Sequence, residues 1–351
     1  MAQGVAVGVA GVGEGEAGVN SPSGSLTDSS IIARLLDEEA EVIHRTKRLF
    51  FEKRIVSVSD ETHVLYRFPV PWFARRLASL LREAESRGIP MQRHRFARAR
   101  WRDLIRQRGC WLVASYEVGA ILQPSRLNAE LVSSFAVSLA RLHSIKAGKP
   151  GALFAYGRPF ESLVGKVDRD VRAALECTDV HDVAARQEML GWLHEHGLFL
   201  RRLNSFHLIH GDLLAKNILV RDDSPEICLI DYELAAFDHA GFELAAALFR
   251  FFGGRNAKYR SEFLERYLSE CAVDISEDWA AHSHYFLVSS ALRMARTRVR
   301  RRKALLGRGE HEAAEVQVGR FNRYVATAFA LMKAYDGGAR SPEELLAAGM
   351  R

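Results

Sequence analysis

The chain has 351 residues, of which 48% are hydrophobic, which is enough for two packed lobes with ordinary globular cores. Its 49 basic and 43 acidic residues give a formal net charge of +6, a balance too mild to indicate a nucleic-acid partner by itself. The four cysteines form no C-x-x-C pair and no apolar run has the length of a membrane span, so we expect a cytoplasmic protein with free thiols.

The N-terminal third is predicted to contain a tail and a small β-rich lobe. Glycine, alanine and valine dominate residues 1–20, and we expect residues 1–30 to form a disordered low-complexity tail. A lobe over residues 31–117 follows, and its first predicted element is a helix through Ile31–Leu36 and Ala40–Ile43. Runs rich in β-branched and aromatic residues then predict an antiparallel sheet, with strands at Leu49–Phe51, Ile55–Val58 and His63–Phe68.

A helical pattern over residues 74–87 and a buried strand over residues 111–116 complete this lobe, and residues 117–119 are predicted to form a hinge. The lobe after the hinge, residues 118–351, is expected to be mainly helical. Its predicted helical segments are Ala129–Ile145, residues 164–203 and the chain that follows residues 206–233, up to the C-terminus. An antiparallel sheet, a hinge and a helical lobe in this order are typical of an α+β fold.

The segment FHLIHGDLLAKNILVRDDSPEICLIDYE carries the most informative pattern in the chain. It places His210, Asp212 and Asn217 in an H-x-D-x-x-x-x-N loop and adds Asp231 after a short apolar run. Phosphoryl transfer from a nucleotide needs a carboxylate that accepts or orients the proton of the attacking hydroxyl, and oxygen ligands that hold magnesium on the phosphates. Asp212 suits the first task, and Asn217 and Asp231 suit the second. We expect His210 to be a buried hydrogen-bonding brace of the loop.

A polar turn between two strands is the alternative interpretation, because short motifs occur by chance. Here the motif has apolar runs on both sides, and these predict short strands at Leu208–Ile209, Ile218–Val220 and Ile227–Ile230. The agreement between motif and structural context favours the phosphotransfer interpretation.

HGDLLAKNIL followed by LIDYELAAFDHAGFELAAALFRFFGG resembles the catalytic segment of choline and ethanolamine kinases. Those enzymes belong with the aminoglycoside phosphotransferases in the protein-kinase-like superfamily. The resemblance implies a protein-kinase-like fold, with Asp212 as catalytic base and with Asn217 and Asp231 as magnesium ligands. It also matches Glu233 and Glu243 to acidic positions of the family pattern, for which a substrate role and a loop-bracing or helix-capping role both stay open.

For the nucleotide, ATP or GTP, the resemblance implies that Arg67 in HVLYRFPV holds phosphates, since choline and ethanolamine kinases carry arginine in this context. The hinge backbone is expected to bind the purine ring through main-chain hydrogen bonds at Tyr116, Glu117, Val118 and Gly119. The chain differs from related kinases in one respect: the segment between the first two predicted strands of the sheet, Leu49–Phe51 and Ile55–Val58, contains no glycine. Either Lys53 or Arg54 contacts the phosphates instead, or nucleotide binding is weak or lost.

For the acceptor, Leu287 and Ser290 stand where choline kinases have tryptophans, so we expect choline to be a poor substrate. Downstream, seven basic residues lie between Arg293 and Lys303. A solvated helix face, an anionic acceptor and a membrane-surface contact are all compatible with this run.

The sequence therefore predicts a magnesium-dependent phosphotransferase that uses ATP or GTP to phosphorylate a hydroxyl of a small molecule. An amino alcohol is the acceptor that the resemblance suggests first, and an aminoglycoside-like compound or a sugar comes next. A pseudokinase-like binding protein is the alternative, favoured by the missing glycine loop and opposed by the intact Asp212, Asn217 and Asp231. A nucleic-acid binder has only the basic run in its favour, and the sequence carries no signal of oligomeric state.

Overall fold

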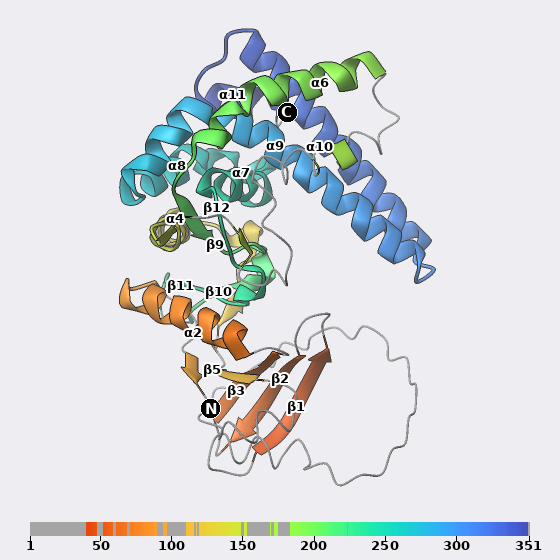
Figure 1. Ribbon diagram of the computed structural model, residues 1–351. Helices are drawn as coiled ribbons and strands as arrows, with labels where there is room; N and C mark the ends of the chain where they lie inside the picture. Colours follow the sequence, from red (N-terminus) through yellow and green to blue (C-terminus); the bar gives the residue numbers. More distant parts are fainter. Residues whose placement is uncertain are drawn as a thin grey trace.

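The computed structural model describes residues 40–47, 52–58, 61–68, 71–89, 94–96, 110–115, 117, 119–148, 151–152, 169, 172–174, 183–222 and 224–349. A sheet-containing N-terminal part and a helical C-terminal part are joined in one chain (Figure 1). This arrangement confirms the predicted α+β class. The expected tail over residues 1–30 and the predicted strand Leu49–Phe51 lie outside the described residues, as does Ile31–Leu36 of the predicted first helix.

The N-terminal sheet is antiparallel and has the strand order β1-β2-β3-β5-β4. Its strands are β1 (Ala40–Lys47), β2 (Glu52–Val58), β3 (Glu61–Phe68), β4 (His94–Phe96) and β5 (Cys110–Ser115). The helix predicted through Ala40–Ile43 is wrong, because these residues form β1 and pair with the end of β2, where Ala40 lies opposite Val58. Strand pairing of this kind, together with the β-branched Val42 and Ile43, overrides a short helical spacing.

Helix α2 (Pro71–Ser86) follows the sheet and starts at a proline, which is tolerated in the first turn of a helix. Its buried face is the predicted stripe of Leu77, Leu80, Leu81 and Ala84. Two arginines tie its C-terminal end to helix α4 (Ala129–His143) of the helical part. Arg87 donates to the carbonyl of Ser144 at 3.0 Å, and Arg141 donates to the carbonyl of Gly88 at 3.1 Å.

The chain passes from one part to the other between β5 and the short strand β6 (Ala120–Ile121), which pairs with β10 (Ile218–Val220) in a different sheet. A Cβ on Gly119 would lie 2.5 Å from the carbonyl oxygen of Val220, so the crossing strand passes close against β10. We therefore propose the lobe boundary where the sequence predicts it, between residues 117 and 118.

The helical part contains two small sheets among its helices. One has the order β11-β10-β6 and the other the order β7-β9-β12-β8. Their remaining strands are β7 (Lys146–Ala147), β8 (Gly151–Ala152), β9 (Phe206–Ile209), β11 (Ile227–Leu229) and β12 (Ala236–Asp238). The remaining helices are α6 (Val183–His196), α7 (Ala240–Phe251), α8 (Arg260–Glu270), α9 (Val273–Leu306), α10 (His311–Asp336) and α11 (Pro342–Gly349).

The core of the helical part lies between α4, α7, α8 and α9. Phe135 of α4 packs edge-on against Phe251 at 5.0 Å between ring centroids, and it also contacts Phe263 at 5.3 Å. Helices α9 and α10 form a long antiparallel hairpin that extends sideways from this core, as Figure 1 shows. The sheets that carry the predicted motif are thus held on a rigid helical base.

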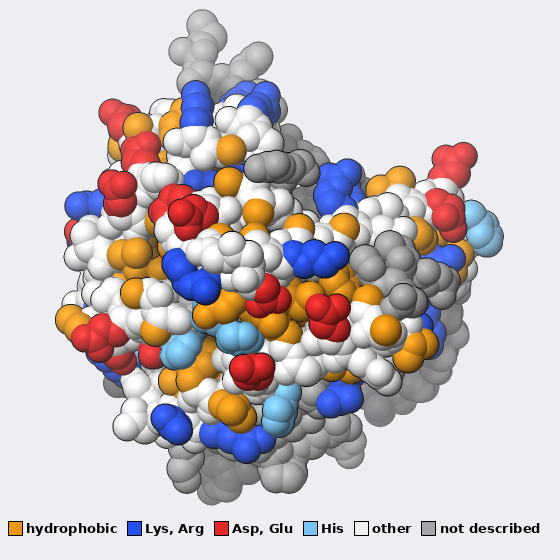
Figure 2. All heavy atoms as spheres, turned by 90° about the horizontal axis from the view of Figure 1, so that it is seen from above, with side chains coloured by type: hydrophobic (Ala, Val, Ile, Leu, Met, Phe, Trp, Pro, Cys, Tyr) orange, Lys and Arg blue, Asp and Glu red, His pale blue; other side chains and the backbone are white. Residues whose placement is uncertain are grey.

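The described helices contain no segment that combines the length and the low charge of a transmembrane span. On the described part of the face seen in Figure 2, acidic and basic side chains are interspersed with apolar ones. The basic side chains on the described part of this face do not form the continuous positive patch that binding to nucleic-acid phosphates favours.

Candidate active site

The H-x-D-x-x-x-x-N loop connects two sheets of the helical part. Strand β9 ends at Ile209, the loop follows, and the 3-10 turn Ala215–Asn217 leads into β10. Gly211 has a φ of +80°, and a Cβ there would lie 2.0 Å from the carbonyl oxygen of Leu234. Only glycine fits this close approach in a left-handed conformation, so the loop geometry is fixed at the residue before Asp212.

Asp212 and Asn217 contact each other directly. The Asn217 Nδ2 group donates to the backbone carbonyl of Asp212 at 2.8 Å and to its Oδ2 at 3.1 Å. Asn217 is buried, whereas the Asp212 carboxylate is partly exposed and has the Lys216 Nζ at 3.8 Å from Oδ2. The amide therefore orients a carboxylate that stays accessible to a ligand.

Asp231 follows β11, the strand that pairs with β10 directly after Asn217. The backbone N–H of Ile230 donates to the carbonyl of Asn217 at 3.0 Å, and Asp231 itself takes a left-handed conformation with φ of 69°. Its Oδ1 is buried and accepts no hydrogen bond from any described residue, although the Lys53 Nζ lies 3.6 Å away. A buried carboxylate oxygen without a described hydrogen-bond donor fits a magnesium ion that keeps most of its ligands as water and phosphate.

His210 is fully buried, as expected for a brace. Its Nε2 is 2.8 Å from the carbonyl oxygen of Ile230, and its ring packs at 4.7 Å between centroids from Tyr232. The imidazole thus links the strand that precedes the loop to the residue that precedes Asp231.

Glu243, in the first turn of α7, lies under the loop and is buried. Its two carboxylate oxygens accept the backbone N–H groups of His210 and Gly211, each at 2.8 Å. The Nε2 of His143 lies 3.1 Å from one of these oxygens, and the hydroxyl of Tyr267 lies 2.6 Å from the other ring nitrogen. Both oxygens are therefore engaged, which favours the loop-bracing alternative for Glu243.

Electrostatics agree with a charged Glu243. Burial by itself raises the pKa of this carboxyl, but the hydrogen bond and charge of His143, together with His210, hold the pKa below its ordinary value. Burial raises the pKa of Tyr267 well above its ordinary value, so its hydroxyl stays a neutral hydrogen-bonding group.

Arg250, at the other end of α7, supports the loop from a second point. Its Nη1 donates to the carbonyl of Leu213, the residue after Asp212, at 2.8 Å. Sequence reasoning missed Arg250, His143 and Tyr267 as parts of the site. For His143 a signal existed in LARLHSI, a segment that resembles the superfamily. Arg250 and Tyr267 had none, because their contacts join residues that lie 37 and 124 positions apart in the chain.

From the N-terminal sheet, Lys53 of β2 extends towards the site, where its Nζ lies 3.6 Å from Asp231 Oδ1. Arg54 is buried, as expected for the next residue of a strand, whose side chain points to the opposite face. Arg67 lies in β3 opposite Glu52 and Trp111, and its side chain lies outside what the structure describes.

The predicted hinge is described only at Glu117 and Gly119; Tyr116 and Val118 lie outside the described residues. The Glu117 carboxylate is 3.9 Å from the guanidinium of Arg221, which follows β10. The side chain of Glu233 also lies outside what the structure describes.

Leu287 and Ser290 do not line an open acceptor site. Both are buried in α9, and the Ser290 hydroxyl donates to the carbonyl of Phe242 in α7 at 3.0 Å. At these positions the helix packs on α7, so an aromatic cage for a quaternary ammonium cannot form there without repacking.

Comparisons with known proteins give a family match, curated relatives and similar solved structures. Residues 60–285 match the model of the phosphotransferase enzyme family. Ethanolamine kinase 2 of Mus musculus is 29% identical over 158 residues, which cover 40% of this chain and 39% of the relative. Ethanolamine kinase 1 of Homo sapiens is 26% identical over 166 residues, which cover 43% of this chain and 36% of the relative. The chain thus matches well under half the length of these curated relatives.

Two solved structures show the fold. A microcompartment-associated aminopropanol kinase superposes with a TM-score of 0.55 at 17% identity, over 92% of this chain and 99% of the other. A Plasmodium vivax ethanolamine kinase superposes with a TM-score of 0.51 at 14% identity, over 85% of this chain and 84% of the other. The predicted kinase-like fold is confirmed.

Proposed function

The chain belongs to the phosphotransferase enzyme family, and on that premise we propose that it transfers a phosphoryl group from ATP or GTP to a hydroxyl of a small molecule. The observation that carries the proposal is the arrangement of Asp212, Asn217 and Asp231. The Asp212 carboxylate is accessible and is oriented by the Asn217 amide. A second, buried carboxylate, that of Asp231, follows Ile230, whose backbone N–H donates to the Asn217 carbonyl.

In this proposal Asp212 is the catalytic base. Its carboxylate accepts the proton of the acceptor hydroxyl as the oxygen attacks the terminal phosphate, and the Asn217 amide holds Oδ2 in place by the 3.1 Å hydrogen bond. The 3-10 turn and Gly211 fix the backbone on both sides of Asp212. Orientation of this kind is most of what a protein contributes to phosphoryl transfer.

We assign Asn217 and Asp231 as the residues that hold magnesium, which neutralises phosphate charge when it is bound. Lys53 lies next to Asp231 and is suited to contact the nucleotide phosphates from the sheet lobe. In this proposal its side-chain charge does what the backbone N–H groups of a glycine loop do in related kinases, and its position near Asp231 supports nucleotide binding in the absence of that loop. Arg67 and the hinge backbone at Tyr116, Glu117, Val118 and Gly119 stay the proposed contacts for the rest of the nucleotide.

An amino alcohol is the acceptor class that the ethanolamine kinase relatives favour, and an aminoglycoside-like compound or a sugar is the second class. We propose that Glu243 braces the loop and does not bind the acceptor, because its oxygens are already hydrogen-bonded to the loop. For Glu233 a substrate role stays a proposal. The pseudokinase alternative differs in one respect, since it predicts nucleotide binding without turnover.

Asp212→Ala tests the proposal. We expect phosphoryl transfer to fall by about a hundred- to ten-thousand-fold, while the affinity for magnesium and nucleotide is retained. Asp222→Ala is the matched control, because Asp222 is an exposed aspartate in the turn after β10. Transfer is measured by product formation over an acceptor panel, and nucleotide affinity by calorimetry. A wild-type chain that binds the magnesium nucleotide yet phosphorylates no acceptor would establish the pseudokinase alternative.

A further inference from the structure

A lysine of the N-terminal sheet and a proposed magnesium ligand of the helical part form an ion pair. Strand β2 lies between β1 and β3 in the sheet, and Lys53, near its start, pairs with Tyr66 of β3. The Lys53 ammonium lies 5.6 Å from the centre of the Tyr66 ring and 3.6 Å from Oδ1 of Asp231. The Lys53 and Asp231 side chains are 26% and 10% exposed, so water screens the attraction between them incompletely.

Of the two partners, Asp231 is fixed and Lys53 is able to move. The residue before Asp231, Ile230, donates its backbone N–H to the carbonyl of Asn217. Asp231 is also the one residue other than glycine with a positive φ, 69°, in the part of the chain that the structure describes. Such a conformation persists only where the surroundings determine it. Lysine, by contrast, carries its ammonium on a flexible aliphatic stem, so a change of partner at this contact is made by Lys53.

The contact between Lys53 and Asp231 leaves the carboxylate oxygen free to bind an ion. A distance of 3.6 Å is longer than an ordinary hydrogen bond, and Oδ1 of Asp231, although buried, accepts no hydrogen bond from a described residue. Lys53 therefore offsets the negative charge of this oxygen without occupying its lone pairs. Those lone pairs are what a hard divalent cation coordinates.

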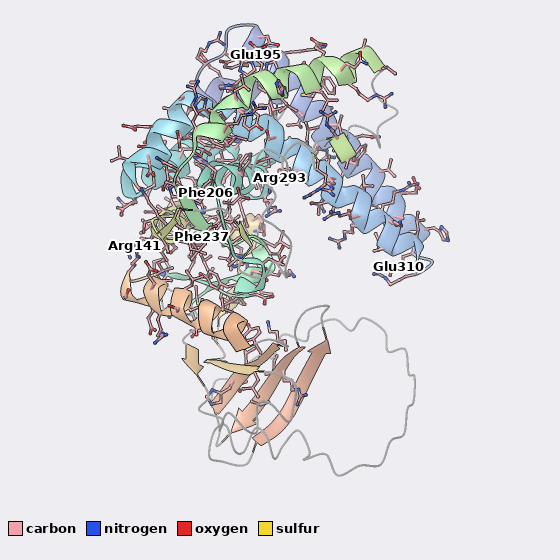
Figure 3. All side chains as sticks on the ribbon, in the orientation of Figure 1. Arg141, Glu195, Phe206, Phe237, Arg293 and Glu310 are labelled. Carbon is pink, nitrogen blue, oxygen red and sulfur yellow. The ribbon has the colours of Figure 1, made fainter. Side chains whose placement is uncertain are left out.

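A second set of contacts joins the N-terminal part to the helical part at α2 and α4. Arg87, directly after α2, donates to the carbonyl and to the hydroxyl of Ser144, and Arg141 of α4 donates to the carbonyl of Gly88. Figure 3 shows Arg141 beside the end of α2. None of these groups belongs to the catalytic loop, so the two parts stay joined at this point when Lys53 changes partner.

The charges around Asp231 limit what can bind to it. A divalent cation coordinated by Oδ1 and the ammonium of Lys53 would share one oxygen, and two cations this close repel each other. A phosphate group removes the conflict, because its oxygens attract both the cation and the lysine. Metal and nucleotide should then each strengthen the binding of the other.

We propose that Lys53 competes with free divalent cations for Asp231 and moves to the nucleotide phosphates when the metal–nucleotide complex enters, so that metal binding depends on the nucleotide. The inference rests on the proposed function and adds a regulation of the same site. Magnesium alone binds weakly, whereas magnesium and nucleotide bind together.

Manganese, a paramagnetic ion that prefers the same oxygen ligands as magnesium, is the probe. Its affinity for the full chain is measured by electron paramagnetic resonance, first without nucleotide and then with a non-hydrolysable ATP analogue. The affinity for the analogue in EDTA is measured by calorimetry. Lys53→Gln should raise the manganese affinity without nucleotide by about fivefold or more, the lower end of usual couplings between sites. It should lower the metal-free affinity for the analogue by about tenfold or more, the value of a charge-assisted hydrogen bond to phosphate.

Three further variants test whether the effect belongs to this ion pair. Lys53→Arg keeps the positive charge and should keep the weak manganese binding of the wild type. Lys216→Gln removes a lysine that lies 3.8 Å from Asp212 and is 52% exposed, so its effect on manganese affinity should be smaller. In the double variant Lys53→Gln/Asp231→Asn the gain should disappear, because the oxygen that binds the metal has lost its charge.

Three results would overturn the inference: a manganese affinity of Lys53→Gln equal to that of the wild type, an equal gain in Lys216→Gln, or a gain that survives in the double variant. If the wild type phosphorylates an acceptor but its manganese affinity does not depend on Lys53, the inference is refuted and the proposed function stands. If manganese affinity depends on Lys53 as expected but the wild type phosphorylates no acceptor, the inference stands and the proposed function is refuted.

Discussion

The brace under the catalytic loop gives the sharpest quantitative prediction. Glu243→Gln replaces one carboxylate oxygen by an amide NH₂ group at a site where two backbone N–H groups donate, each at 2.8 Å. Glutamine retains one acceptor, so one of the donors, on His210 or Gly211, faces another donor. The side chain is buried, and water cannot replace the lost acceptor without a rearrangement of the loop.

The magnitude follows from these contacts. A buried donor left without an acceptor costs about 1–3 kcal/mol, and weakening the remaining hydrogen bond from a charged to a neutral acceptor costs about 1 kcal/mol more. We therefore expect Glu243→Gln to lower the free energy of unfolding by about 2–4 kcal/mol. Because the lost contacts hold the residues immediately before Asp212, kcat should fall as well, with a smaller effect on the KM of the nucleotide.

Urea unfolding at a series of pH values, with Glu265→Gln as the control, measures the effect. Glu265 is an exposed residue of α8, the helix that also carries Tyr267. The pKa of Glu243 is lowered in the folded protein, so its carboxylate contributes stability that is fully present above its ordinary value of 4.5. This contribution is lost as the pH falls below that value towards the pKa of the folded protein.

The difference in unfolding free energy between the wild type and Glu243→Gln should therefore be constant from neutral pH down to about pH 5 and should shrink in more acidic solution. If the wild type, Glu243→Gln and Glu265→Gln unfold at the same urea concentration at neutral pH, the stabilising role of Glu243 under the loop is refuted. A difference that grows on acidification would show that the sign of the linkage is wrong.

Two further predictions concern the same loop. Asp231→Asn should weaken magnesium-dependent nucleotide binding more than Asn217→Ala does, because an anionic oxygen holds a hard dication more strongly than an amide oxygen does. Magnesium titrations in the presence of a fluorescent nucleotide compare the two variants. Equal losses of affinity, or a larger loss in the Asn217 variant, would contradict the assignment of the magnesium ligands. Gly211→Ala should destabilise the protein by more than about 1 kcal/mol and reduce kcat, because its Cβ would meet the Leu234 carbonyl oxygen at 2.0 Å in a left-handed conformation. Urea unfolding measures the change in stability, and in the same assay Gly319→Ala in α10, where a Cβ meets nothing within 4 Å, should be neutral or stabilising.

The sequence by itself determined the fold class, the family and the local frame of the candidate site. These depend on patterns within short segments, such as the apolar strands around the H-x-D-x-x-x-x-N loop. Asn217 reaches Asp212 across five positions, so a local motif is sufficient to place them together. The helix predicted through Ala40–Ile43 failed for the opposite reason, because its conformation is set by pairing with β2, which local spacing does not reveal.

Only the tertiary structure decided what surrounds that frame. His143 and Glu243 are a hundred positions apart, and Arg298 meets Tyr324 from another helix, so no spacing along the chain predicts either contact. The sequence left two roles open for Glu243 and three for the basic run. For Glu243 burial favours the bracing role, because a charged group taken out of water must find its partners in the fold, and Glu243 finds them in the loop and in His143.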